Sequence, residues 1–228
     1  MYASTMKLAL IAALSLAASN ADADCAFSGL IAKPITVANT ALPADGGIVI
    51  AALPDRTGKL DPGDPALDHA FVIKGVAKAT ARSLAPGLAV VPVPANTTEL
   101  YDQVGKPVLA IKTTTDKPKL APAPIVKKIE YTLGRRRGIE QVFVTIDKLP
   151  ADALAIVLSD PKGKPKSWGL VSRTTGGRLL GFSSTSCQAL PNGTVPSKEG
   201  DQVIVQLVDA YGRLSAPTRP LRITLVGP

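Results

Sequence analysis

Residues that carry chemistry are scarce in this chain of 228 residues, which has one histidine, two cysteines and one tryptophan. A Ser–His–Asp triad needs a histidine between an acid and a nucleophile, and the nucleophile motif Gly-x-Ser-x-Gly does not occur in the sequence. Transition-metal sites usually take two or more His or Cys ligands. The composition therefore favours a non-catalytic protein without a cofactor. An exported hydrolase that uses two carboxylates stays an alternative, because the chain has 18 acidic residues.

Aromatic residues are also few. They make up 4% of the chain, whereas hydrophobic residues make up 46%. A packed core is expected, and it must consist mainly of Val, Ile, Leu and Ala. The 19 glycines and 20 prolines exceed average usage but stay below the roughly 25–30% that is typical of disordered chains. This content indicates a folded protein with many turns rather than long helices.

A long hydrophobic run occurs only near the N-terminus. The apolar segment Leu8–Ala18 follows Lys7 and precedes a small-x-small site that ends at Ala23. This pattern predicts a signal peptide over residues 1–23 and a secreted or periplasmic protein, with association at the cell surface as a further option. A membrane-spanning helix needs about 20 apolar residues, so no membrane span is expected. A buried N-terminal helix and a lipid anchor at Cys25 stay open as alternatives.

The two cysteines, Cys25 and Cys187, both follow the predicted cleavage site. In an oxidising compartment a single pair of cysteines most often forms a disulfide. We therefore predict a bond between Cys25 and Cys187 that ties the mature N-terminus to the C-terminal half. Two unpaired thiols are the alternative.

The positive charge of the chain is concentrated in its second half. The whole chain carries a formal net charge of +8. Residues 24–124 contain 10 basic and 9 acidic side chains, whereas residues 125–228 contain 15 basic and 8 acidic side chains. This asymmetry predicts an anionic partner such as a polysaccharide, lipid headgroups or a cell-wall polymer. The partner could instead be another envelope protein, and the charge could serve solubility alone. Nucleic acid is not expected as a partner of an exported protein.

Two short segments hold the sharpest basic features. One places three arginines between glycines, and the other places three lysines before a tryptophan that could stack on a sugar. We predict weak anion binding at Arg135, Arg136, Arg137, Lys162, Lys164, Lys166 and Trp168. Two solvated hairpin tips are the alternative.

The only histidine lies among aspartates in the segment 61–71. Calcium takes six to eight oxygen ligands, and carboxylates supply them well. The spacing matches no calcium loop, and two prolines restrict how these side chains converge. A polar loop is therefore the favoured interpretation, and a metal-binding periplasmic protein is the alternative, with Asp61, Asp64, Asp68 and His69 as ligands.

A change of composition divides the chain. The segment Thr113–Pro124 is rich in Pro, Ala and Lys, which is typical of an extended, semi-rigid linker. We predict an N-terminal domain over residues 24–112, a linker over 113–124 and a C-terminal domain over 125–228.

Apolar residues alternate with polar ones in the second half, as in half-buried strands. The alternation is clear at residues 129–133, 142–146 and 203–207. Seven short segments typical of strands, separated by Gly/Pro turns, predict an antiparallel sandwich. The phrase LVDAYGRLSAPTRPLRITL, residues 207–225, resembles the last hairpin of a fibronectin type III or immunoglobulin-like domain. The segment Thr36–Leu53 is similar to the opening of bacterial immunoglobulin-like domains. These resemblances imply an all-β secreted bacterial protein with two β-sandwich domains that binds or scaffolds through surface loops.

Overall fold

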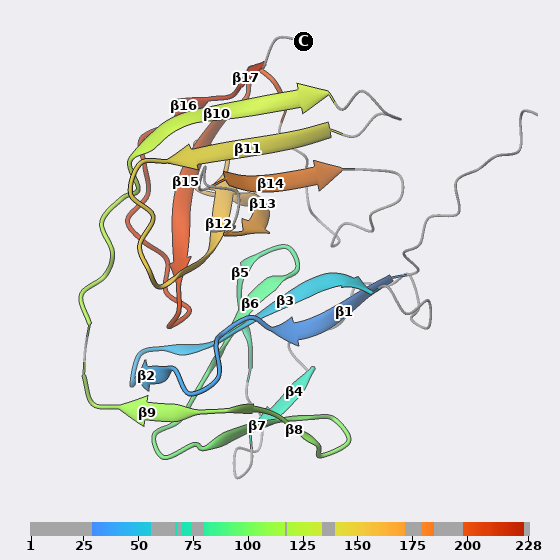
Figure 1. The fold of residues 1–228 in the computed structure, drawn as a ribbon, viewed down its shortest axis with the longest axis vertical. Helices are drawn as coiled ribbons and strands as arrows, with labels where there is room; N and C mark the ends of the chain where they lie inside the picture. The colour runs from blue at the N-terminus through green and yellow to red at the C-terminus, as the bar shows by residue number, and fades with distance from the viewer. Residues whose placement is uncertain are drawn as a thin grey trace, which may run out of the picture.

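The computed structural model describes residues 29–55, 67, 70–73, 80–116, 118–133, 140–171, 179–184 and 198–225. Every regular element in these residues is a β-strand (Figure 1). The prediction of an all-β protein is therefore confirmed. Within the described part of the chain, no helix has the length and apolar character needed to cross a membrane.

Strands β1 to β9 form what we call the N-terminal sheet pair. One sheet has the order β1-β3-β6-β5 and the other has the order β4-β7-β8, while β2 and β9 form a short parallel pair. The strand bounds are β1 Gly29–Pro34, β2 Ala41–Pro43, β3 Gly47–Asp55, β4 Phe71–Ile73, β5 Arg82–Ala85, β6 Leu88–Pro92, β7 Glu99–Asp102, β8 Pro107–Ala110 and β9 Lys112–Thr114.

Strands β10 to β17 form the C-terminal sheet pair. One sheet has the order β14-β11-β10-β17 and the other has the order β13-β12-β15-β16. The strand bounds are β10 Val126–Leu133, β11 Glu140–Ile146, β12 Ala153–Ser159, β13 Pro165–Leu170, β14 Leu179–Ser184, β15 Gln202–Asp209, β16 Leu221–Arg222 and β17 Thr224–Leu225.

The strand order identifies both sheet pairs as immunoglobulin-like sandwiches. Such a sandwich has strands A, B, E and D in one sheet and C, F and G in the other. In the N-terminal pair, β1, β3, β6 and β5 take the order A-B-E-D, and β4, β7 and β8 take the order C-F-G. In the C-terminal pair, β10, β11 and β14 correspond to A, B and E, and β13 lies beside C as strand C′. The predicted immunoglobulin-like β-sandwich is confirmed at this level.

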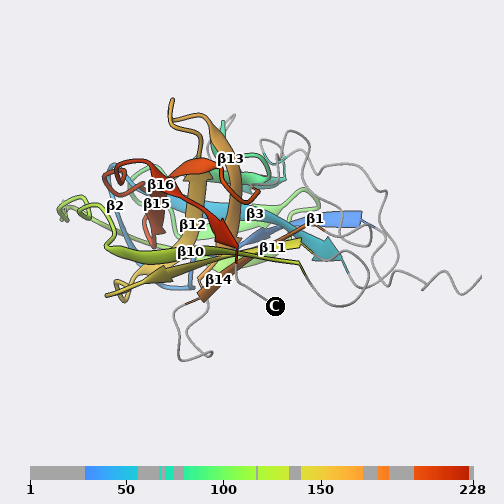
Figure 2. The same ribbon diagram turned by 90° about the horizontal axis from the view of Figure 1, so that it is seen from above.

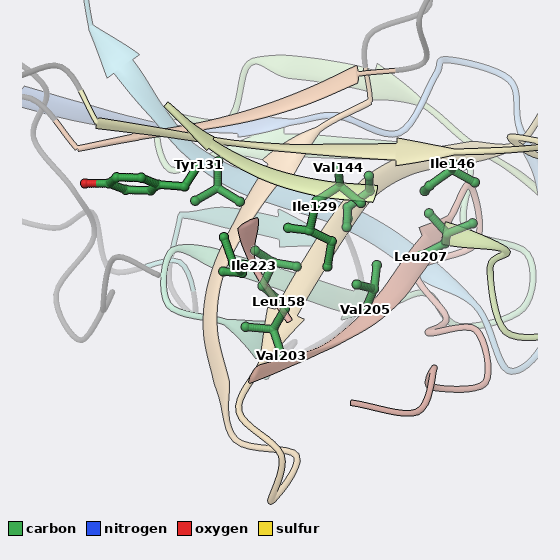
Figure 3. Packing of buried hydrophobic residues seen from close by; sticks show 12 residues of the cluster. Ile129, Tyr131, Val144, Ile146, Leu158, Val203, Val205, Leu207 and Ile223 are labelled. Atoms are coloured by element: carbon green, nitrogen blue, oxygen red, sulfur yellow. The ribbon is translucent and has the colours of Figure 1, made fainter. Parts of the chain in front are cut away.

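The core of the C-terminal sheet pair is aliphatic apart from one tyrosine. Ile129 and Val144 on one sheet point toward Leu158 and Val205 on the other (Figure 3). Their burial follows the alternation in the sequence, because successive side chains of a strand point to opposite faces. The predicted inward positions that are buried are Ile129, Tyr131, Val142, Val144, Ile146, Val203, Val205 and Leu207.

The central strand β3 is buried on both of its faces. Ile48 and Ile50 face the second N-terminal sheet and pack with Leu100. Val49 and Ala51 face the opposite way and belong to a different cluster. Because β3 contributes side chains to two cores, the sheet β1-β3-β6-β5 needs a covering layer on each side.

That second covering layer is the sheet β13-β12-β15-β16 of the C-terminal pair. The two sheets enclose a cluster that we call the central core, and the molecule is consequently a stack of sheets with apolar cores between them (Figure 1). The N-terminal pair contributes Val49, Ala51, Leu84, Ala85, Leu88 and Val90, and the C-terminal pair contributes Ala155, Val157 and Val208.

The predicted linker contacts the C-terminal sheet pair. Its start belongs to β9, and its later part is extended without a strand partner. The backbone N–H of Ala216 donates to the carbonyl oxygen of Ala121 (3.0 Å), and the Arg213 guanidinium donates to the carbonyl oxygen of Pro118 (2.7 Å). The segment is thus held at Pro118 and Ala121, and the domain boundaries placed there stay a prediction.

Candidate functional site

The lysine-rich turn between β12 and β13 is closed by hydrogen bonds of its own. The N–H of Gly163 donates to the carbonyl oxygen of Asp160 (2.9 Å), which closes a four-residue turn. The carboxylate of Asp160 accepts the backbone N–H groups of Lys162 and Lys164, each at 2.9 Å. Gly163 has φ +83°, a conformation that favours glycine. The turn therefore presents the exposed side chains of Lys162 and Lys164 on a fixed backbone.

Hydrogen bonds also stabilise the ionised form of the Asp160 carboxyl group in this turn. The backbone N–H of Lys164 holds the pKa of Asp160 below its usual value, with smaller contributions from the Lys162 N–H and from the Lys166 and Lys162 ammonium groups. Hydrogen bonds to the charged form favour that form. Asp160 is ionised at neutral pH, as an ordinary aspartate is, and its carboxylate accepts hydrogen bonds from the backbone of its own turn.

A second turn lies at the same end of the sheet. Asp201 accepts a hydrogen bond from the backbone N–H of Lys198 (3.1 Å), and its carboxylate lies 3.9 Å from the Lys166 ammonium. Arg222 pairs with Gln202 across β15 and β16, and its guanidinium lies beside Gly200. We call the segments 160–166, 198–202 and 219–222 the basic end of the C-terminal sheet pair.

Trp168, which the sequence groups with these lysines, packs against the central core. Its indole N–H donates to the carbonyl oxygen of Pro86 in the other sheet pair (2.8 Å). The tryptophan therefore joins the two sheet pairs. Anion binding by Lys162, Lys164, Lys166 and Trp168 stays a prediction.

The turn between β15 and β16 fits into the N-terminal sheet pair. Gly212 has φ +75°, and a Cβ atom there would overlap Cγ2 of Val90. The N–H of Gly47 donates to the carbonyl oxygen of Tyr211 (2.8 Å), and the Arg82 guanidinium donates to that of Gly212 (3.4 Å). We call this contact, together with the central core and the hydrogen bond from Trp168 to Pro86, the joint. No local sequence pattern predicts the joint, although Gly212 is a signal of a close approach.

A nearly buried ion pair shapes the same turn. The Arg213 guanidinium lies 2.8 Å from the Asp209 carboxylate, with side chains only 10% and 7% exposed. Asp209 also accepts the backbone N–H groups of Tyr211 and Arg213, each at 2.9 Å. The guanidinium lies 5.0 Å from the centre of the Tyr211 ring, within the range of a cation–π contact. These contacts fix the turn that enters the N-terminal sheet pair.

A shallow, mainly apolar hollow of about 360 Å³ lies on the sheet β4-β7-β8, lined by Val72, Tyr101, Asp102, Gln103 and Gly105. The Tyr101 hydroxyl donates a hydrogen bond to Glu99, and this bond raises the pKa of Tyr101, with smaller contributions from desolvation and the Glu99 charge. No motif in the sequence predicts this hollow. Among the described residues, no group of three or more His, Cys, Asp or Glu side chains is placed to hold a metal ion.

Several predicted sites lie outside the described residues. They are the signal peptide with Cys25, the partner cysteine Cys187, the arginines Arg135, Arg136 and Arg137, and the weak metal site of Asp61, Asp64, Asp68 and His69. The corresponding disulfide, anion and metal predictions stay predictions.

No protein-family model matches this chain, and no curated protein matches it. Among solved structures, the fibronectin(III)-like modules of Clostridium thermocellum CbhA are similar to it, with 12% sequence identity and a TM-score of 0.30. That match covers 86% of this chain and 95% of the other. The fold assignment therefore rests on the strand order and not on this likeness.

Proposed function

We propose that this protein is a non-catalytic β-sandwich protein that holds two domains in one fixed arrangement and binds or scaffolds through surface turns. The domains correspond to residues 24–112 and 125–228, with residues 113–124 as the linker. The observation that carries this proposal is the joint, because an apolar core and directional hydrogen bonds connect sheets from both halves of the chain. Domains are expected to move relative to one another unless the interface between them is apolar and well packed.

Small-angle X-ray scattering of the chain without residues 1–23 tests this proposal. The matched variant carries a short Gly/Ser insertion between Thr115 and Asp116, where both residues are exposed. If the joint sets the arrangement, both proteins give the same maximum dimension, because a longer flexible linker adds little entropy cost to a closed contact. A larger maximum dimension in the insertion variant would refute the fixed arrangement.

Export belongs to the same proposal. The apolar segment Leu8–Ala18 and the site at Ala23 support secretion or a periplasmic location, and a role in the cell envelope follows from that location. Intact-mass measurement on protein recovered from a secreting host is expected to give a chain that begins at Asp24. Retention of residues 1–23 would contradict export by signal-peptide cleavage.

A further inference from the structure

The basic end combines cations from three segments that are distant in sequence. The turn between β12 and β13 lies beside the start of β15, since Ser159 pairs with both Pro165 and Ile204. The cations of the basic end are Lys162, Lys164, Lys166, Lys198, Arg219 and Arg222, and its acids are Asp160, Glu199 and Asp201. The end therefore carries net positive charge after its own acids are counted.

The acids leave most of these cations unpaired. Asp160 is bound to the backbone of its own turn, and Asp201 is bound to the Lys198 N–H and lies near Lys166. Among the described residues, no carboxylate lies within salt-bridge distance of Lys162, Lys164 or Arg222. These three side chains are exposed. They can contact an external anion without first breaking an internal ion pair.

The spacing of these cations suits a polymer better than a single ion. Neighbouring strands lie about 4.8 Å apart, so the basic end extends about 14 Å from β13 to β16. One exposed ion pair contributes only about 0–1 kcal/mol. Several contacts along one chain add together, and each releases bound counterions. Figure 2 shows the turn between β12 and β13 reaching out of the body on the side where β16 lies.

We propose that the basic end binds an acidic polysaccharide through its carboxylate or sulfate groups. This proposal rests on the proposed function, which gives the exported body that carries the site. The surroundings disfavour other polyanions. Single-stranded nucleic acid is bound with aromatic stacking, and Trp168 is engaged in the joint. Peripheral membrane binding is favoured by apolar anchors, and none of the exposed large hydrophobic residues of the described chain lies in the basic end.

Retention of the mature chain on polygalacturonate and on heparin columns across a salt gradient tests the proposal. The test variant is Lys162→Gln, Lys164→Gln, Arg222→Gln. The control is Lys33→Gln, Lys106→Gln, Lys112→Gln, which removes the same charge from exposed positions in the N-terminal sheet pair. Circular dichroism confirms that both variants fold. We expect about tenfold or greater loss of affinity in the test variant, a shallower salt dependence, and near-native binding in the control.

Polygalacturonate presents carboxylates alone, whereas heparin presents sulfates together with carboxylates. Binding to either matrix supports the proposal, and binding to heparin alone indicates that carboxylates are not sufficient. Monomeric galacturonate is expected not to compete, because a single charge makes too few contacts. Equal losses in the test and control variants would refute the site. Tighter binding to anionic lipid vesicles or to DNA than to both polysaccharides at equal salt would refute the ligand class. These outcomes are independent of the scattering experiment, so the site can fail while the fixed arrangement holds.

Discussion

Replacing Gly212 by alanine is the sharpest perturbation of the joint. This glycine has φ +75°, and an added Cβ atom would overlap Cγ2 of Val90 and lie 3.2 Å from the carbonyl oxygen of Gly47. The left-handed conformation costs a non-glycine residue about 1–2 kcal/mol. Overpacking in a core adds about 1–3 kcal/mol. The free energy of unfolding is therefore expected to fall by about 2–5 kcal/mol.

The matched control is Gly163→Ala in the lysine-rich turn. Gly163 has φ +83°, and no heavy atom beyond its two chain neighbours lies within 4 Å of the position of a Cβ atom there. This control carries the backbone cost of about 1–2 kcal/mol without the steric conflict. Each kcal/mol shifts the melting temperature by about 2–4 °C in a chain of this size. Thermal unfolding followed by circular dichroism should therefore show a clearly lower melting temperature for Gly212→Ala than for Gly163→Ala.

A second substitution identifies the source of the difference. Val90→Ala removes the Cγ2 atom that the new methyl group at position 212 would contact. The double variant is therefore expected to lose about 1 kcal/mol less free energy of unfolding than the two single variants lose together. Equal destabilisation by Gly212→Ala and Gly163→Ala, together with no coupling to Val90, would refute the close contact between the sheet pairs.

Two further predictions concern single side chains. Trp168→Phe keeps an aromatic ring in the central core and removes the hydrogen bond to the Pro86 carbonyl, so it should lower the free energy of unfolding by about 1 kcal/mol in urea titrations. Unchanged stability would contradict a role for that bond. The hydrogen bond to Glu99 raises the pKa of Tyr101 in the folded protein. The bond therefore stabilises the fold at pH values below the pKa of an unfolded tyrosine, and this stabilisation is lost as the pH rises through the higher pKa of the folded protein. Absorbance titration at alkaline pH should show Tyr101 ionising later than in Glu99→Gln, and identical curves would exclude the interaction.

Local patterns in the sequence were sufficient for the strands of the C-terminal sheet pair. Alternation at residues 142–146 and 203–207 gave the buried positions, because only one face of each strand meets the inner core. The turn over residues 209–212 was also predictable, and the N–H of Gly212 donates to the carbonyl oxygen of Asp209 (3.0 Å). The return side of the hairpin that residues 207–225 resemble is less regular than that resemblance implies. Residues 215–220 form no strand, since Pro217 and Pro220 lack N–H donors. The N–H groups of Ser215 and Thr218 still donate to the carbonyl oxygens of Leu207 and Val205, and regular strand pairing resumes at β16.

The joint was not predictable by the same reasoning, because its contacts are distant in sequence. The hydrogen bond from Arg82 to Gly212 joins residues 130 positions apart. Trp168 follows three lysines, and that context suggested an exposed ring, whereas its partner Pro86 lies 82 positions earlier. For Arg213, the charge was visible in the sequence, but its burial against Asp209 depends on the packing of the linker.

If the joint holds both sheet pairs together, they form one cooperative body and unfold together. Trp168 offers a direct test because it is the only tryptophan in the chain and packs in the joint. Urea unfolding of the mature chain should be followed by tryptophan fluorescence and by far-ultraviolet circular dichroism on the same samples. A single cooperative unit predicts coincident transitions with the same midpoint. A fluorescence transition at clearly lower urea than the loss of β-structure would show that the joint opens while the sheets persist, and would contradict the account.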